Sequence, residues 1–182
     1  LLAAGADKNK GDNQGNSPLF IASQNGHMDT VKNLLIAGVE NDKDKSGQEG
    51  ATPLFIASEM GNSEIVRILL KAGADKDKCI NDGTTPLFIA CDKGNTEIVS
   101  VLLKAGADKY MCRNDGATPL FIACEKGNSD VVSILLQEGR NIDQHKNDGT
   151  TPLIIACEKG HTEIVRRLLQ KRAQKNKCRN DG

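Results

Sequence analysis

The most chemically reactive side chains in this 182-residue chain belong to six cysteines and three histidines. Thiolates and imidazoles bind zinc when they are spaced as Cys-x-x-Cys or similar Cys/His pairs, and this sequence contains no such pair. The cysteines instead recur at a fixed interval. Cys91, Cys124 and Cys157 are 33 residues apart, and so are Cys79 and Cys112. Each series therefore marks one structural position that the chain copies.

This copying also argues against disulfides. If the copies stack like packed helices, equivalent atoms lie roughly 8–10 Å apart, whereas a disulfide requires Cα atoms within about 7 Å. The pattern predicts free thiols in a reducing compartment, and hence an intracellular protein in the cytoplasm or the nucleus.

Other kinds of catalytic arrangement are missing from the sequence. There is no glycine-rich phosphate loop, no Cys/His or Ser/His/Asp arrangement, and no pair of carboxylates that stands apart from the repeated background. We therefore predict that the chain is not an enzyme and binds no metal or cofactor.

Charge and hydropathy exclude two further classes. Lys plus Arg and Asp plus Glu each number 24, so the formal net charge is zero, and the basic surplus of nucleic-acid-binding proteins is absent. No apolar run approaches the roughly 20 residues that a membrane-spanning helix needs.

A repeated triplet, Ser/Thr-Pro-Leu, indicates the structural units that position these side chains. Its proline occurs at residues 18, 53, 86, 119 and 152, at intervals of 35, 33, 33 and 33 residues. Self-similarity of this kind indicates an array of stacked units. A 33-residue unit is too small to bury a stable core alone, so neighbouring units must cover it.

The third copy predicts two helices joined by a tight turn. Thr85 can cap the first helix, Pro86 fits its first position, and Gly94 can end it in a left-handed conformation. A second helix is expected from residue 95 or 96, with Glu97 in its first turn, where the helix dipole favours an anion. Its apolar stripe comprises Ile98, Val99, Leu102 and Leu103.

The segment after this second helix should form an extended finger. It begins after Gly106 and reads ADKYMCRNDG, which is polar and ends in Asp-Gly, a strong reverse-turn signal. The corresponding finger between residues 38 and 50 is two residues longer, and we expect it to bulge near residues 41–47.

These motifs, TTPLFIA, GN, IVSVLL and GAD in the third copy, resemble the ankyrin repeat. The signature of that family is Thr-Pro-Leu-His-x-Ala, then Gly-His, Val-x-x-Leu-Leu and Gly-Ala. The resemblance implies a predominantly α fold, an ankyrin-repeat solenoid of stacked helix-turn-helix units with β-turn or hairpin fingers. One continuous solenoid domain is expected, with the tail of a preceding repeat at 1–14 and repeats at 15–49, 50–82, 83–115, 116–148 and 149–181, the last of them divergent at its end.

Departures from the family pattern lead to further expectations. The family's His after Thr-Pro-Leu is Phe at 20, 55, 88 and 121 and Ile at 154, which predicts apolar packing between repeats. The Gly-His position holds His27, Asn62, Asn95, Asn128 and His161, and either residue type can hydrogen-bond backbone at a turn. In the last repeat Arg172 replaces the helix-ending glycine, so a changed ending is expected after Gln170.

The resemblance implies a concave recognition surface built from finger tips and the exposed ends of the first helices. Carried over position by position, the helix ends are Gln24-Asn25, Glu59-Met60, Asp92-Lys93, Glu125-Lys126 and Glu158-Lys159. The finger KYMCR adds Tyr110, Met111 and Arg113, residue types enriched at interface hot spots. The alternative for the helix ends is that they form an ordinary solvated face. The alternative for the finger is that Tyr110 and Met111 are chance surface substitutions.

Two functional hypotheses follow. In the first, the chain is an interaction scaffold that binds a partner protein of unknown identity on the concave surface, without catalysis. In the second, it is a targeting or regulatory arm of a larger enzyme or signalling protein. The sequence has no initiating Met, which favours a piece of a longer polypeptide, and end-to-end self-association through uncapped repeats is a further expectation.

Overall fold

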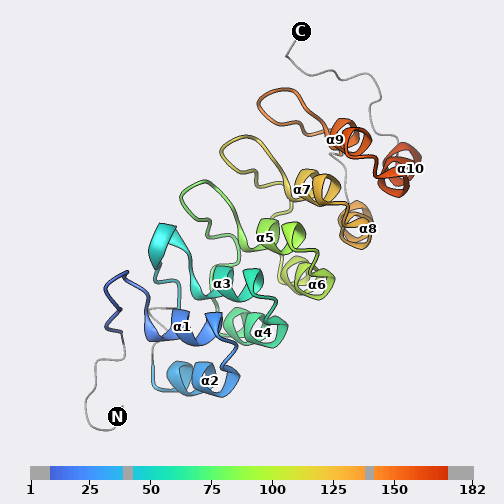
Figure 1. Ribbon diagram of the computed structural model, residues 1–182. Coiled ribbons are helices and arrows are strands. Elements are labelled where there is room, and N and C mark those ends of the chain that lie inside the picture. Colours follow the sequence, from blue (N-terminus) through green and yellow to red (C-terminus); the bar gives the residue numbers. More distant parts are fainter. Residues whose placement is uncertain (1–8, 39–42, 138–141, 172–182) are drawn as a thin grey trace.

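The computed structural model describes residues 9–38, 43–137 and 142–171, which form ten α-helices and one short 3-10 helix and contain no strand. The helices occur as consecutive pairs that stack in one row, from α1 and α2 at one end to α9 and α10 at the other (Figure 1). Their bounds are α1 Pro18–Gln24, α2 Met28–Ile36, η3 Gln48–Gly50, α3 Pro53–Glu59, α4 Ser63–Lys71, α5 Pro86–Asp92, α6 Thr96–Lys104, α7 Pro119–Lys126, α8 Ser129–Gln137, α9 Pro152–Glu158 and α10 Thr162–Gln170.

Packing runs between neighbours along the row. The first helices of successive pairs contact one another in the order α1, α3, α5, α7 and α9, and the second helices follow the order α2, α4, α6, α8 and α10. The extensive helix contacts lie within one pair or between adjacent pairs. This arrangement confirms the predicted solenoid, in which each unit is covered by the units beside it.

Each first helix begins with the predicted cap. The Thr85 hydroxyl accepts a hydrogen bond from the backbone N–H of Phe88 at 3.1 Å, and Pro86 occupies the first turn, where no amide donor is needed. Equivalent bonds begin the other first helices at Ser17, Thr52, Thr118 and Thr151.

We expect Thr85→Ala to lower the free energy of unfolding by about 0.5–2 kcal/mol, because it removes this cap from a buried helix terminus. Urea denaturation followed by circular dichroism measures the change. Thr96→Ala is the control, since Thr96 lies within α6 and the N-cap position there belongs to Asn95. Equal effects of the two substitutions would contradict the capping role.

The second helices contribute an apolar stripe to the core. Ile98, Val99 and Leu102 are fully buried in α6, whereas Leu103 is only half-buried. In α10 Leu168 is buried but Leu169 is 38% exposed. In both helices the second leucine of the pair is therefore less buried than the first.

The finger tips form hydrogen-bonded turns, as the Asp-Gly signal predicted. Gly83 N–H donates to the Ile80 carbonyl at 2.9 Å, and Gly116 N–H donates to the Arg113 carbonyl at 2.8 Å. Neighbouring tips are also joined, since the backbone N–H of Asn114 donates to the Asp82 carbonyl at 2.9 Å. The fingers project on the same side of the row of helices (Figure 1).

Neighbouring units are further tied at the Gly-Asn turns. The side-chain amide of Asn62 donates to the Ser23 carbonyl at 2.9 Å, and that of Asn128 donates to the Cys91 carbonyl at 2.8 Å. His161 lies at the same position, with Nε2 at 3.2 Å from the Glu125 carbonyl. These residues bond backbone as predicted, but in the preceding unit rather than in their own turn.

The aromatic positions are structural. Phe20, Phe55, Phe88 and Phe121 are all at least 95% buried between the first helices, which confirms apolar packing in place of the family histidine. The described cysteines are free thiols, as predicted; burial raises the pKa of the Cys91 and Cys124 thiols, whereas Cys79, Cys112 and Cys157 are exposed.

Two expectations reach beyond the described residues. Part of the predicted bulge lies in 39–42, and the residues that follow lead into η3, where Glu49 adopts a left-handed backbone with φ 58°. The helix α10 ends at Gln170, and Arg172 lies outside the described residues. Among the helices that the structure describes, none has the length and apolar character to cross a bilayer.

Candidate functional site

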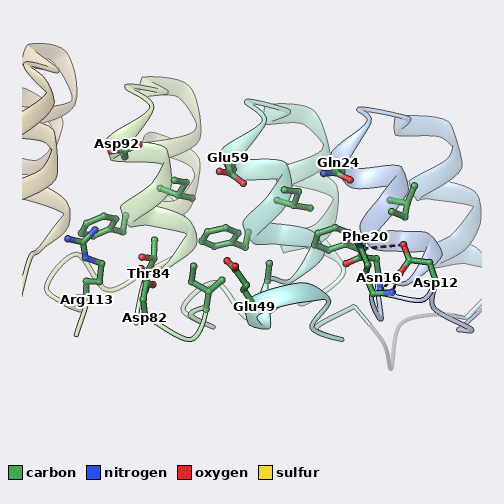
Figure 2. A pocket seen from close by; sticks show the side chains of 18 residues that line it. Asp12, Asn16, Phe20, Gln24, Glu49, Glu59, Asp82, Thr84, Asp92 and Arg113 are labelled. Carbon is green, nitrogen blue, oxygen red and sulfur yellow. Dashed lines mark hydrogen bonds between the residues drawn. The ribbon is translucent and has the colours of Figure 1, made fainter. Parts of the chain in front are cut away.

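A groove of about 560 Å³ runs across the first three units. It lies between the C-terminal ends of the first helices α1, α3 and α5 on one side and the fingers on the other (Figure 2). Its lining comprises Asp12, Gln14, Asn16, Phe20, Ile21, Gln24, Glu49, Ala51, Phe55, Ile56, Glu59, Ile80, Asp82, Thr84, Phe88, Ile89, Asp92 and Arg113.

Two rows of polar side chains border the groove. Gln24, Glu59 and Asp92 are the last residues of α1, α3 and α5, so the helical stacking places them one unit apart in one row. The fingers supply the opposite row, in which Glu49 and Asp82 precede the tip glycines of successive units (Figure 2). Both walls are therefore predominantly acidic.

The floor between these rows is apolar. Phe55 and Ile56 of α3 are buried there, and they are packed against by the half-buried side chains of Ile21, Ile80 and Ile89. The three half-buried isoleucines present accessible hydrocarbon at the base of the groove, so a bound chain could bury apolar surface between two polar walls.

Arg113 closes the groove at one end. Its guanidinium carbon lies 5.3 Å from the centroid of the Phe88 ring, and Nη2 donates to Asp115 Oδ2 at 2.6 Å. Lys146 pairs with the same carboxylate at 3.3 Å and covers the Phe121 ring at 5.6 Å. From the third unit onward, basic side chains therefore cover the rings of Phe88 and Phe121, and they neutralise the Asp115 carboxylate.

Hydrogen bonding to Arg113 holds the pKa of Asp115 well below its ordinary value of 3.8. A carboxyl group with a lowered pKa in the folded state stabilises the fold above its unfolded pKa, and this stabilisation is lost as the pH falls through the folded value. We therefore expect Asp115→Asn to destabilise the protein at pH 7 and to cost progressively less below pH 3.8. Denaturation series from pH 7 to pH 2 measure this difference.

Asp82→Asn, at the same position of the adjacent finger, is the control and should lower the free energy of unfolding less at pH 7. A pH-independent loss of stability for Asp115→Asn would contradict the ion pair of Asp115 as the cause.

The structure brings together only part of the predicted contact set. Asp92 and Arg113 line the groove, and Asp92 pairs with Lys126 of the next unit at 3.4 Å. Met60 follows α3 with 49% of its surface exposed, and Lys93 is exposed beyond the end of α5. Farther along the row, Glu125 is half-buried, whereas Glu158 and Lys159 are exposed.

Tyr110 lines a different hollow. It is 38% exposed, the Lys109 ammonium lies 5.7 Å from its ring centroid, and it borders a cavity of about 430 Å³ with Leu103 of α6 and Ile134 of α8. Tyr110 and Arg113 are three residues apart in the finger, yet they border separate cavities, one beside the second helices and one beside the first.

Tyr110 and Met111 differ in chemistry from their counterparts one unit earlier. There the Asp77 carboxylate accepts a hydrogen bond from the Asp108 N–H at 2.9 Å, and the Lys78 ammonium donates to the Asp44 carbonyl at 2.6 Å. A thioether at residue 111 cannot reproduce the ammonium donor of Lys78.

Sequence reasoning did not single out the finger carboxylates Glu49 and Asp82. The signal that could have found them is their recurrence one unit apart, directly before the tip glycine. No group of three or more His, Cys, Asp or Glu side chains suited to a metal ion occurs in the parts of the chain that the structure describes.

Comparison with protein families matches nearly the whole chain. The model described as ankyrin repeats (3 copies) matches residues 1–79, 19–111, 76–146 and 105–181. No curated protein matches the chain.

Proposed function

The chain belongs to the ankyrin repeat family, and on this basis we propose that it is a non-catalytic module that binds a partner protein in the groove. Ankyrin repeats generally act as protein–protein interaction modules, and the family is typically non-catalytic. The observation that carries the proposal is the groove itself, in which an apolar floor of Ile21, Ile80 and Ile89 lies between two polar rows.

This anatomy matches what protein interfaces require. Apolar contact at the centre supplies affinity, and a polar rim fixes register and excludes wrong partners. The floor is built on packed first helices and the rim on fingers joined by backbone hydrogen bonds, such as that from Asn81 N–H to the Glu49 carbonyl at 3.0 Å. A surface held in this way loses little conformational entropy on binding.

The proposed contact surface extends beyond the groove along both edges. On the helix side it includes Met60, Lys93, Glu125, Lys126, Glu158 and Lys159. On the second-helix side Tyr110 and Met111 form a separate contact, and the exposed Tyr110 ring beside the cavity of α6 and α8 supports it.

The test uses two tryptophan substitutions in one unit. A partner is captured from a lysate, identified by mass spectrometry and purified, and its affinity for each variant is measured by calorimetry. Gln24→Trp obstructs the groove, whereas the matched Asn33→Trp places the same bulk on the exposed surface of α2. We expect the first variant to bind at least about tenfold more weakly, a loss of about 1.4 kcal/mol, and the second to bind normally.

Equal affinities for these two variants would contradict the groove as the binding surface. Tyr110→Ala and Met111→Ala, measured against the same partner, test the separate contact. Unchanged affinity in both would remove Tyr110 and Met111 from the proposed surface while leaving the groove in place.

A further inference from the structure

We propose that the groove selects a positively charged, extended segment of its protein partner, with Lys or Arg side chains set among apolar ones. The inference rests on the proposed function and specifies the chemistry of the occupant. The inference is based on the positions of the groove carboxylates that form no ion pair with a lysine or arginine in the described part of the chain.

Three carboxylates that line the groove form no ion pair among the described residues. Within the parts of the chain that the structure describes, Glu49, Glu59 and Asp82 make no ion pair with a lysine or arginine. The Asp82 carboxylate accepts a hydrogen bond from the Thr84 N–H at 2.8 Å, which orders the side chain without neutralising it. The one arginine that lines the groove, Arg113, donates to Asp115 instead.

The next carboxylate in each row is paired with basic side chains. One unit farther, the finger carboxylate of Asp115 is shared by Arg113 and Lys146, and Asp92 is paired with Lys126. The chain is neutral overall, so the groove is a local acidic region and not the consequence of a net negative charge. Clefts that carry one sign of charge above low-dielectric walls concentrate the opposite charge and guide its approach.

The arrangement also constrains the spacing of the bound segment. Glu49 and Asp82 lie on one wall and Glu59 lies on the other (Figure 2). The half-buried Ile21 and Ile89 also line the groove. Equivalent positions of stacked helices are roughly 8–10 Å apart, which corresponds to about three residues of extended chain at about 3.3 Å per residue. A segment running along the groove would therefore repeat its basic and apolar side chains at intervals of about three residues.

The probe for this proposal is a library of random 12-residue peptides displayed on phage and selected on the native chain. Selected peptides are synthesised, and their affinities are measured by fluorescence polarisation. We expect enrichment of Lys and Arg with apolar residues between them, and affinity that weakens as salt is raised from 50 to 500 mM, because screening acts on exposed charges.

The decisive comparison removes three charges without changing shape. The variant Glu49→Gln/Glu59→Gln/Asp82→Asn should bind the selected peptides at least about tenfold more weakly, since each exposed charge pair contributes modestly and three act together. The matched control Asp29→Asn/Glu64→Gln/Asp130→Asn removes the same number of charges from exposed positions of the second helices and should bind within twofold of the native chain.

Two results would overturn the proposal: selection of neutral or acidic peptides, or affinity of the groove variant equal to that of the native chain. Gln24→Trp separates this failure from failure of the proposed function. If peptides of any composition lose affinity for Gln24→Trp, the groove still binds protein segments, and only the preference for basic ones is wrong. If they bind Gln24→Trp normally, the groove is not the binding surface and both proposals fail.

Discussion

Leu102→Ala is expected to lower the free energy of unfolding by about 2–5 kcal/mol, the range for buried leucines whose truncation leaves a cavity. Leu102 lies in α6 at the middle of the array and has no exposed surface. Adjacent second helices α4 and α8 contact α6 on both sides, so the surrounding structure has little freedom to collapse into the space. Guanidinium denaturation followed by circular dichroism measures the loss.

Leu169→Ala is the matched control for this prediction. Leu169 is the second leucine of the pair in α10 and is 38% exposed, so its truncation removes less buried surface and leaves no enclosed cavity. We expect it to cost less than about 1 kcal/mol. A loss under 1 kcal/mol for Leu102→Ala, or equal losses for both variants, would contradict the placement of the apolar stripe.

Gly116→Ala should cost about 2–5 kcal/mol through two separate effects. Gly116 has φ 84°, and a non-glycine residue in this left-handed region costs roughly 1–2 kcal/mol. A Cβ there would also lie 2.8 Å from Asn147 Oδ1 and 2.9 Å from the Asn147 backbone nitrogen. Relieving that overlap requires the next finger to shift, and overpacking of this kind typically costs about 1–3 kcal/mol.

Gly15→Ala separates the two effects. Gly15 occupies the same finger position and has φ 82°, but a Cβ there would meet no atom within 4 Å. Gly15→Ala should therefore lower the free energy of unfolding only through backbone strain, by about 1–2 kcal/mol. Thermal and urea denaturation of both variants give the comparison, and a Gly15→Ala cost as large as that of Gly116→Ala would refute the close approach of adjacent fingers.

Local elements were predictable because their signals are local. The Thr85 cap, the Pro86 start and the Asp115-Gly116 turn each depend on residues within four positions of one another, and the structure confirms all three. The exposed Leu169 could not be foreseen in this way, because burial depends on whether another helix covers that face.

The sequence by itself determined the repeating unit, its two helices and the stacking of units, because a 33-residue period in capping, apolar and turn residues admits few other arrangements. Only the tertiary structure decided which charges meet. Glu49 and Glu59 face each other across an apolar floor, Asp115 is neutralised by Arg113 and Lys146, and Tyr110 is directed to another cavity than Arg113. The physical reason is that ion pairing and exposure depend on distances between units, whereas capping and periodicity act within one.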